Sequence, residues 1–445
     1  MTLAKVVSRQ VYRRLGICPS LVRRFCDHGD SDDSIKKGAV ARYIPGRIKR
    51  RLKARGLTED DLEITQVTKP SKSVDVQQAL RDSIVDKDIT VDFPSDITKD
   101  IERRQQEKHA HRPAGVDPQT TSILLFPGQG SQFVGMGKKL LAYPGVEELY
   151  HNASKILGYD LLNICINGPI EKLNRTVYCQ PAIVVTSLAT LKKLQEEDPT
   201  AYENCVGAAG FSVGEFTALV ASEMLSFEDA IYLIKLRAEA MQKMSERVDS
   251  GMMTVMTDHQ SKIRVAMVAA REYCSRKLKI QDPVCKIANF LCTNVKVVAG
   301  HTEALDFLQQ YGREWHLNKM KRLPVSGAFH TQLMNDGSEE FYKYWRAWNN
   351  VSFNQSKFAV HSNVDGKRYI VGEEDHTRPF GKIISTLRRQ MYEPVQWEQT
   401  MHILFSRRQG LTYPRVFEVG PGKQLGVLLK KTNSKAYEQY SHIDC

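Results

Sequence analysis

The sequence lacks the marks of several protein classes. Its longest apolar runs, such as the one from Ala182 to Leu191, fall far short of the roughly 20 residues that a membrane-spanning helix needs. None of its 9 cysteines forms a C-x-x-C pair, and an odd number suits neither a closed disulfide framework nor a zinc ribbon. We therefore expect no membrane span, no metal site, and reduced cysteines that serve as small hydrophobic residues.

Acidic side chains are absent from residues 1–26. Basic residues there, including Lys5, Arg9 and Arg13, alternate with apolar residues at helical spacing, and no uninterrupted apolar core of a secretory signal occurs. An arginine-rich amphipathic leader without acidic residues is typical of a mitochondrial transit peptide. We therefore expect import into the mitochondrial matrix. The alternative is an ordinary basic N-terminal helix of a cytosolic protein.

The net charge of +12 is unevenly distributed. Residues 1–55 hold 15 Lys and Arg against 4 Asp and Glu, whereas residues 118–445 hold 39 against 33. A basic surface that binds nucleic acid would extend over the folded part of the chain. The charge therefore does not favour a nucleic-acid partner. Residues 27–117 are polar, highly charged and poor in apolar periodicity, so we expect a disordered linker there.

Alternating strand and helix patterns begin at Ser122. The apolar segment from Ser122 to Phe126 predicts a buried strand that ends in a Pro-Gly turn. The pattern continues with a strand over Cys205–Gly210 and helices near 136–157, 180–196, 214–223 and 227–246. Such alternation predicts an α/β domain with a parallel sheet. It resumes after residue 326, with strands near Phe358–His361 and Arg415–Val419.

Residues 251–326 have a different order of elements. The pattern predicts strands at 252–257, 284–289, 295–299 and 321–325, with helices at 259–275 and 303–311. The order β-α-β-β-α-β is that of a ferredoxin-like unit. We therefore expect a ferredoxin-like subdomain over 251–326, inserted between the two parts of the core, 118–250 and 327–445.

The segment Gly210-Phe-Ser-Val-Gly214 is a G-x-S-x-G motif that follows a predicted strand and precedes a predicted helix. Glycines permit the sharp turn that exposes a nucleophilic serine, here Ser212, at the amino end of the helix. The alternative is a serine in a glycine-flanked helix start. A serine nucleophile needs a base, and His330 stands in a loop of small residues after a strand. A lone histidine is more often structural.

Seven motifs follow one another along the chain. They are Phe126-Pro-Gly-Gln-Gly-Ser-Gln132, Gln180-Pro-Ala182, Gly210-Phe-Ser-Val-Gly-Glu215, Leu236-Arg-Ala-Glu-Ala-Met-Gln242, Gly327-Ala-Phe-His330, Pro394-Val-Gln-Trp397 and Glu418-Val-Gly-Pro-Gly-Lys423. This is the order seen in malonyl-CoA:acyl carrier protein transacylases, and the chain most resembles the mitochondrial type found in animals. The resemblance covers residues 120–435, and it implies an α/β-hydrolase-like core with a ferredoxin-like subdomain.

The resemblance also implies roles for individual residues. Ser212 would accept the acyl group, His330 would act as its base, and a backbone carbonyl at Gln390 would hold the histidine. Arg237 would pair with the free carboxylate of malonate; without the motif, the alternative is an ordinary exposed helix arginine. The remaining implied residues are Gln129 and Val213 in the oxyanion hole and Gln180, Met241 and Phe329 in the substrate site. One departure is Phe211, where many members have histidine.

The chemistry implied is a two-step transfer through a malonyl-serine ester. The expected partners are malonyl-CoA and acyl carrier protein, with no metal or redox cofactor, and the chain is expected to be a monomer. Two alternatives differ in class: a serine hydrolase built on the same elbow, and a non-catalytic scaffold that binds carrier protein or RNA. The hydrolase would need an acidic partner for His330, and the sequence nominates none.

Overall fold

The computed structural model describes residues 113, 115–325, 327–347, 351–370, 381–406 and 412–445. The expected transit peptide and nearly all of the expected linker lie outside these residues. The described residues all belong to one unit by their internal contacts. Among the described helices, none combines the length and the hydropathy that a membrane crossing requires.

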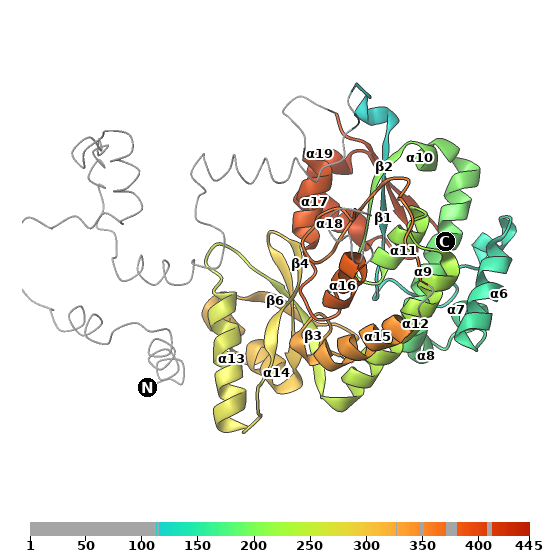
Figure 1. Cartoon of the computed structure of the whole chain (residues 1–445). Helices are drawn as coiled ribbons and strands as arrows, with labels where there is room; N and C mark the ends of the chain where they lie inside the picture. The colour runs from blue at the N-terminus through green and yellow to red at the C-terminus, as the bar shows by residue number, and fades with distance from the viewer. Residues whose placement is uncertain (1–112, 114, 326, 348–350, 371–380, 407–411) are drawn as a thin grey trace, which may run out of the picture. The chain divides into compact units, whose positions relative to one another are not determined.

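A five-stranded parallel sheet forms the centre of the core (Figure 1). Its strand order is β7-β2-β1-β8-β9, and every neighbouring pair is parallel. Because the strands are parallel, their carboxyl ends meet at one edge of the sheet, where ligands of such folds bind. The strands are β1 (Ser122–Phe126), β2 (Cys205–Gly210), β7 (Ala359–His361), β8 (Arg415–Val419) and β9 (Tyr440–Ile443).

Helices cover both faces of this sheet. Leu124 and Phe126 of β1 pack with the larger hydrophobic cluster, whereas Ile123 and Leu125 pack with a second cluster that contains Trp397. Both strands are buried at every position, and burial on both faces explains why, apart from Ser122, neither β1 nor β2 alternates apolar with polar residues. The helices of the core are α6 (Val146–Leu157), α7 (Leu161–Asn167), α8 (Ile170–Asn174), α9 (Thr176–Glu197), α10 (Pro199–Glu203), α11 (Gly214–Ala221), α12 (Phe227–Arg247), α15 (Asn335–Ala347), α16 (Gly381–Arg389), α17 (Trp397–Phe405), α18 (Gln424–Thr432) and α19 (Ser434–Tyr437).

One predicted helix begins later than its apolar pattern indicates. The helix expected near 136–157 begins only at Val146, and the preceding residues form a short 3₁₀ helix over Lys139–Ala142. Gly137 and Gly145 have φ angles of 86° and 74°, in the left-handed region that an α-helix cannot include. The two glycines therefore divide the segment.

A four-stranded antiparallel sheet forms the predicted subdomain. Its strand order, β4-β5-β3-β6, is that of a ferredoxin-like unit, so this prediction is confirmed. Figure 1 shows α13 and α14 on the side of this sheet that faces away from the core. The elements are β3 (Ser250–Met256), α13 (Ile263–Lys277), β4 (Cys285–Cys292), β5 (Val295–His301), α14 (Thr302–Tyr311) and β6 (Asn318–Arg322).

The subdomain is attached to the core through β4. Strand β4 packs against α17 and α18, and its main chain exchanges two hydrogen bonds with Val395. The Val395 amide donates to the Ala288 carbonyl at 2.8 Å, and the Phe290 amide donates to the Val395 carbonyl at 2.9 Å. Alternate residues of the sheet, such as Met252 on β3, face a cavity that lies between the subdomain and the carboxyl edge of the parallel sheet.

Candidate active site

Ser212 lies in a sharp turn between β2 and α11. Its φ angle is 52°, a strained value for a residue other than glycine. A Cβ atom on Gly210 would lie 1.9 Å from the carbonyl carbon of Gly214, and one on Gly214 would lie 2.5 Å from the carbonyl oxygen of Phe126. Only glycine fits at both positions. The turn is therefore a nucleophile elbow, with Ser212 8% exposed at the wall of the cavity.

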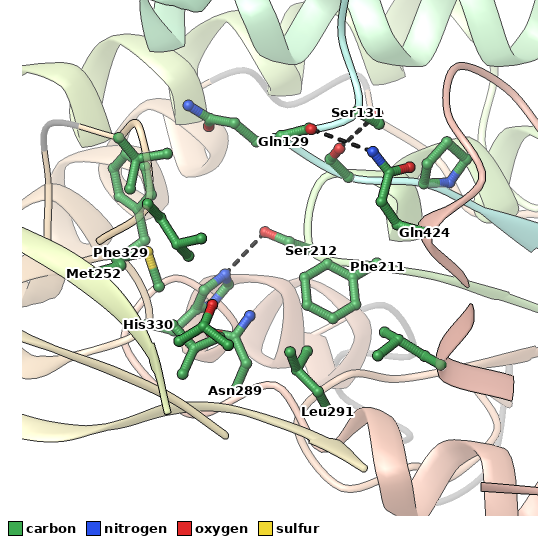
Figure 2. A pocket seen from close by; sticks show the side chains of 18 of the residues that line it. Gln129, Ser131, Phe211, Ser212, Met252, Asn289, Leu291, Phe329, His330 and Gln424 are labelled. Atoms are coloured by element: carbon green, nitrogen blue, oxygen red, sulfur yellow. Dashed lines mark hydrogen bonds between the residues drawn. The ribbon is translucent and has the colours of Figure 1, made fainter. Parts of the chain in front are cut away.

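The imidazole of His330 lies beside the serine hydroxyl (Figure 2). Ser212 Oγ is 2.9 Å from His330 Nε2, and His330 Nδ1 is 2.6 Å from the backbone carbonyl oxygen of Gln390. A carbonyl oxygen can only accept, so Nδ1 carries the hydrogen and Nε2 is free to accept the serine proton. Burial and the nearby Arg237 lower the pKa of His330 to about 3. The imidazole is therefore neutral, as a base requires.

The side chain of Gln390 also takes part in the site. Its Nε2 donates to the Ser212 carbonyl at 2.8 Å and to Glu215 Oε2 at 2.6 Å, while its Oε1 accepts from Arg237 Nη2 at 2.8 Å. The resemblance implied only the backbone carbonyl of this residue. The structure places its side chain at the junction of the elbow, the base and a buried cation.

Arg237, on α12, is fully buried behind Ser212. Its Nη1 donates to Gln180 Oε1 at 2.6 Å, and its Nη2 donates to Ser212 Oγ at 3.2 Å as well as to Gln390. Its Nε has no hydrogen-bond partner among the described residues. Burial lowers the pKa of the guanidinium to about 10, and Glu215 opposes that shift. A cation therefore stands within hydrogen-bond distance of the nucleophile and retains an unused donor.

A cavity of about 390 Å³ opens in front of Ser212. Gln129, Met241 and Phe329 line it, whereas Gln180 and Val213 do not. Gln180 instead contacts Arg237 and donates from Nε2 to Met241 Sδ at 3.6 Å. The other lining residues are mostly apolar and come from both the core and the subdomain, among them Phe211, Met252, Leu291, Val297, Leu323, Leu425 and Leu428.

The two residues implied for the oxyanion hole flank the serine from different segments. Val213 is at the amino end of α11, and Gln129 is in the loop that follows β1. In Figure 2 this loop lies on one side of Ser212 and His330 on the other. No acceptor within the described ranges takes a hydrogen bond from either backbone amide. Both amides are thus free to bind an oxyanion that forms beside Ser212.

No group of three or more His, Cys, Asp or Glu side chains in the described part of the chain is arranged so as to hold a metal ion. The polar groups around Ser212 are instead the imidazole of His330, the guanidinium of Arg237 and the amide of Gln390. Such a set is suited to acyl transfer by a serine nucleophile with a neutral base.

Comparison with known proteins agrees with this chemistry. Residues 123–275 match the acyl transferase domain family. Over 327 residues the chain is 48% identical to the human protein named malonyl-CoA–acyl carrier protein transacylase, mitochondrial, and the match covers 74% of this chain and 81% of the human one. The chain belongs to the malonyl-CoA–acyl carrier protein transacylase family.

Solved transacylase structures share the fold. The malonyl-CoA:acyl carrier protein transacylase from Xanthomonas oryzae superposes with a TM-score of 0.62 at 30% identity, covering 73% of this chain and 95% of that one. A malonyl-transacylase solved in complex with its type II polyketide synthase acyl carrier protein superposes with a TM-score of 0.61 at 29% identity, covering 73% and 96%. Both fit the α/β core with its antiparallel subdomain.

The residue before the nucleophile departs from the pattern of many transacylases. Phe211 packs edge-to-face on Trp397, with the ring centroids 5.3 Å apart, and it lines the cavity. Its amide donates to the Phe126 carbonyl at 2.9 Å, which ties the elbow to the end of β1. Phe211 therefore contributes apolar wall and backbone support beside the nucleophile, and its side chain can neither accept nor donate a proton.

Sequence reasoning missed three members of this transacylase site: Glu215, Asn363 and Tyr369. Asn363 follows β7, and its Oδ1 accepts from the Ser212 amide at 2.6 Å. Tyr369 donates to Glu215 Oε1. A signal for Asn363 was present, because it comes two residues after a predicted strand whose carboxyl end meets that of β2.

Proposed function

We propose that this protein transfers malonyl groups from coenzyme A to the phosphopantetheine thiol of acyl carrier protein, through a malonyl ester of Ser212, in mitochondrial fatty acid synthesis. The observation that carries the proposal is the pairing of a buried cation with a nucleophile. Arg237 Nη2 is 3.2 Å from Ser212 Oγ, so an acyl group on the serine has a guanidinium within reach. Family membership supports the same reaction.

In the first step the Ser212 hydroxyl attacks the thioester carbonyl while His330 Nε2 takes its proton. The negative charge that develops on the carbonyl oxygen faces the amides of Gln129 and Val213. The carbon–sulfur bond then breaks, and the coenzyme A sulfur leaves with the proton from His330. In the second step the carrier protein's thiol attacks the ester, and His330 again receives and returns one proton.

Arg237 gives the reaction its selectivity for a carboxylated acyl group. In the free protein its Nη2 donates one hydrogen to Ser212 Oγ. An ester oxygen is a poorer acceptor than a hydroxyl, so acylation of Ser212 releases that donor for the malonyl carboxylate. A guanidinium can bind a carboxylate through two parallel hydrogen bonds. Because Arg237 is fully buried, this carboxylate also supplies the cation with an anionic partner.

The alternative reaction is hydrolysis of the same acyl-serine. A hydrolase of this type holds its histidine with a carboxylate, which stabilises the imidazolium. Here the group at His330 Nδ1 is the neutral Gln390 carbonyl, and no carboxylate among the described residues bonds to this imidazole. The largely apolar cavity also provides few groups to orient a water molecule. These features favour transfer to a thiol over hydrolysis.

The site requires one chain and no added group. Every residue in the two steps belongs to a single chain, so the proposal needs only a monomer. It includes no metal or redox cofactor, since the serine, the histidine and the two thiols balance the reaction. The human relative is named as mitochondrial, which supports the same organelle for this protein, and we place it in the matrix.

Mass spectrometry of the intact protein and of its proteolytic peptides, after mixing with malonyl-CoA, tests the proposal. We expect one malonyl adduct on the peptide that contains Ser212, its disappearance on addition of carrier protein bearing phosphopantetheine, and no adduct in Ser212→Ala. An adduct on a cysteine, or one that water removes as fast as the carrier protein does, would contradict it.

A further inference from the structure

A buried carboxylate that has no part in the two steps lies directly beneath the nucleophile. Glu215 is in the first turn of α11 and is fully buried. It accepts three hydrogen bonds: from the Tyr369 hydroxyl, from Gln390 Nε2 at 2.6 Å and from the backbone amide of Asn363 at 3.2 Å. A buried carboxylate is costly unless it is paired and hydrogen-bonded, so its presence here calls for a reason.

Glu215 determines which way the amide of Gln390 faces. A carboxylate only accepts hydrogen bonds and a guanidinium only donates them. The amide lies between Glu215 and Arg237, so its NH₂ group must point to Glu215 and its Oε1 to Arg237. Reversal of the amide would set donor against donor at Arg237 and acceptor against acceptor at Glu215. The carboxylate thus orients Gln390, and Gln390 in turn positions the Arg237 guanidinium.

Glu215 is also connected, through its hydrogen-bond partners, to the base and to the elbow. The backbone carbonyl of Gln390 accepts from His330 Nδ1, so the position of Gln390 sets the direction of Nε2. Asn363 donates its backbone amide to Glu215, and its side chain binds both sides of the turn. Its Oδ1 accepts from the Ser212 backbone amide, and its Nδ2 donates to the Gly210 carbonyl at 2.7 Å. Gln390 and Asn363 are both hydrogen-bonded to Glu215. Through these two residues Glu215 is linked to the base, to the Arg237 guanidinium and to the turn that holds Ser212.

Charge supports the same arrangement. Glu215 acts on Arg237 through the Gln390 amide, and its negative charge favours the protonated guanidinium. The cation and the anion come from α12 and α11, and Gln390 follows α16. The fold thus brings Gln390 from a distant part of the chain to two residues on consecutive helices, which is expected of an arrangement that serves the site rather than one helix.

We propose that Glu215 is a positioning residue of the transfer reaction: through Gln390 it aligns both the base His330 and the selectivity cation Arg237 on Ser212. The inference rests on the proposed function, because it concerns the rate at which the malonyl-serine ester forms. It assigns no contact with substrate to Glu215.

Two substitutions separate positioning from charge. In Glu215→Gln the side-chain oxygen still accepts from Gln390 and Asn363, while the new amide donates to the Tyr369 hydroxyl, which can accept. Glu215→Leu has similar bulk but offers no acceptor to Gln390. We expect Glu215→Gln to retain most of the rate of malonyl-serine formation and Glu215→Leu to lose roughly a hundredfold, the scale of a misplacement of about 1 Å.

The rate is measured by rapid-quench mass spectrometry and expressed per site that finally acquires malonate, so unfolded protein does not count. Thr217→Val is the matched control: Thr217 is buried on the same helix, and its hydroxyl has no hydrogen-bond partner among the described residues. A full rate per site in Glu215→Leu, or an equal loss in Thr217→Val, would overturn the inference.

If Glu215→Leu does not fold, Glu215→Asp decides the question. Aspartate keeps the charge but is one methylene too short to reach Gln390, so the rate per site should fall while that of Glu215→Gln holds. The reverse order, with Asp active and Gln inactive, would show that charge alone matters and would refute positioning. Failure of the unaltered protein to form malonyl-serine would count against the proposed function instead.

Discussion

His330 Nδ1 is held 2.6 Å from the backbone carbonyl oxygen of Gln390, so the base is oriented by a group that cannot ionise. A carboxylate in that place would raise the pKa of the imidazole by stabilising its charged form. The carbonyl raises it less than burial and Arg237 lower it. The base consequently remains neutral over the whole physiological range.

Substitution of Arg237 should separate the two substrates malonyl-CoA and acetyl-CoA. Charged hydrogen bonds contribute about 1.5–3 kcal/mol each, so Arg237→Ala should lower kcat/KM for malonyl transfer by roughly ten- to more than a hundredfold. Acetyl transfer should hold or rise, because acetate brings no carboxylate and the buried charge is gone. Lysine cannot donate two parallel hydrogen bonds, so Arg237→Lys should recover only part of the malonyl rate. Equal losses for both thioesters would mean that Arg237 is structural.

His330 should make the fold sensitive to acid. Its folded-state pKa is lowered to about 3, whereas the unfolded chain binds the proton near 6.5. Its contribution to stability is therefore complete above pH 6.5 and is lost as the pH falls toward 3. At pH 5 the loss should be about 2 kcal/mol.

The His330→Asn variant tests this acid effect. Asparagine tolerates the left-handed backbone at this position, where φ is 60°. Urea unfolding at pH 7 and pH 5 should show a smaller decrease in the free energy of unfolding for the variant than for the unaltered protein. Equal decreases would place the acid sensitivity elsewhere.

Protonation of Glu215 should leave the rate of malonyl-serine formation almost unchanged. Burial raises its pKa to about 7, against the effect of its hydrogen bonds and of Arg237. A protonated carboxyl can donate from Oε1 to the Tyr369 hydroxyl, which can accept, while Oε2 still accepts from Gln390, as in Glu215→Gln. The unaltered protein and Glu215→Gln should therefore show the same dependence of the rate on pH between pH 8 and pH 6. A decrease of the rate below pH 7 that Glu215→Gln removes would show that the charge of Glu215 sets the rate.

The elbow glycines should tolerate no side chain. In Gly214→Ala the new Cβ would lie 2.5 Å from the backbone oxygens of both Phe126 and Pro127, neither of which can move without shifting β1. We expect a loss of at least about 3 kcal/mol or failure to fold, at the upper end of overpacking effects. Gly251→Ala is the control, since its nearest neighbour would be the Arg322 side chain at 3.7 Å. Similar melting temperatures for Gly214→Ala and Gly251→Ala would show that the elbow can accept a side chain at Gly214.

The central strands of the core were predictable, because β1 and β2 consist mostly of apolar residues and end next to proline or at glycine. The predicted bounds of Cys205–Gly210 and Arg415–Val419 are those of the structure. Strand β9 (Tyr440–Ile443) was missed, since it lies at the sheet edge, partly exposed, and has no apolar pattern. Strand β6 lies over Asn318–Arg322 rather than 321–325. Its pairing with β3 runs from Arg322 opposite Met253 to Asn318 opposite Met256, across an irregularity in β3, so the strand begins before the predicted start.

The site was predictable only in part. Ser212 was indicated by the local turn, and its partners by the order of motifs. An acidic residue in the first turn of a helix is usually explained by the helix dipole, so nothing in the sequence indicates that Glu215 is buried. Asn363 and Tyr369 reach the elbow because β7 pairs with β2, and that pairing joins segments about 150 residues apart that no local pattern connects.

The short segment from Gln390 to Val395 is attached at both ends. Its first residue holds the imidazole of His330, and its last is hydrogen-bonded to β4 of the antiparallel sheet. The antiparallel sheet, which forms the far wall of the cavity, and the base His330 are thus both hydrogen-bonded to this one segment. Any shift of this wall would therefore also move the carbonyl that orients the imidazole.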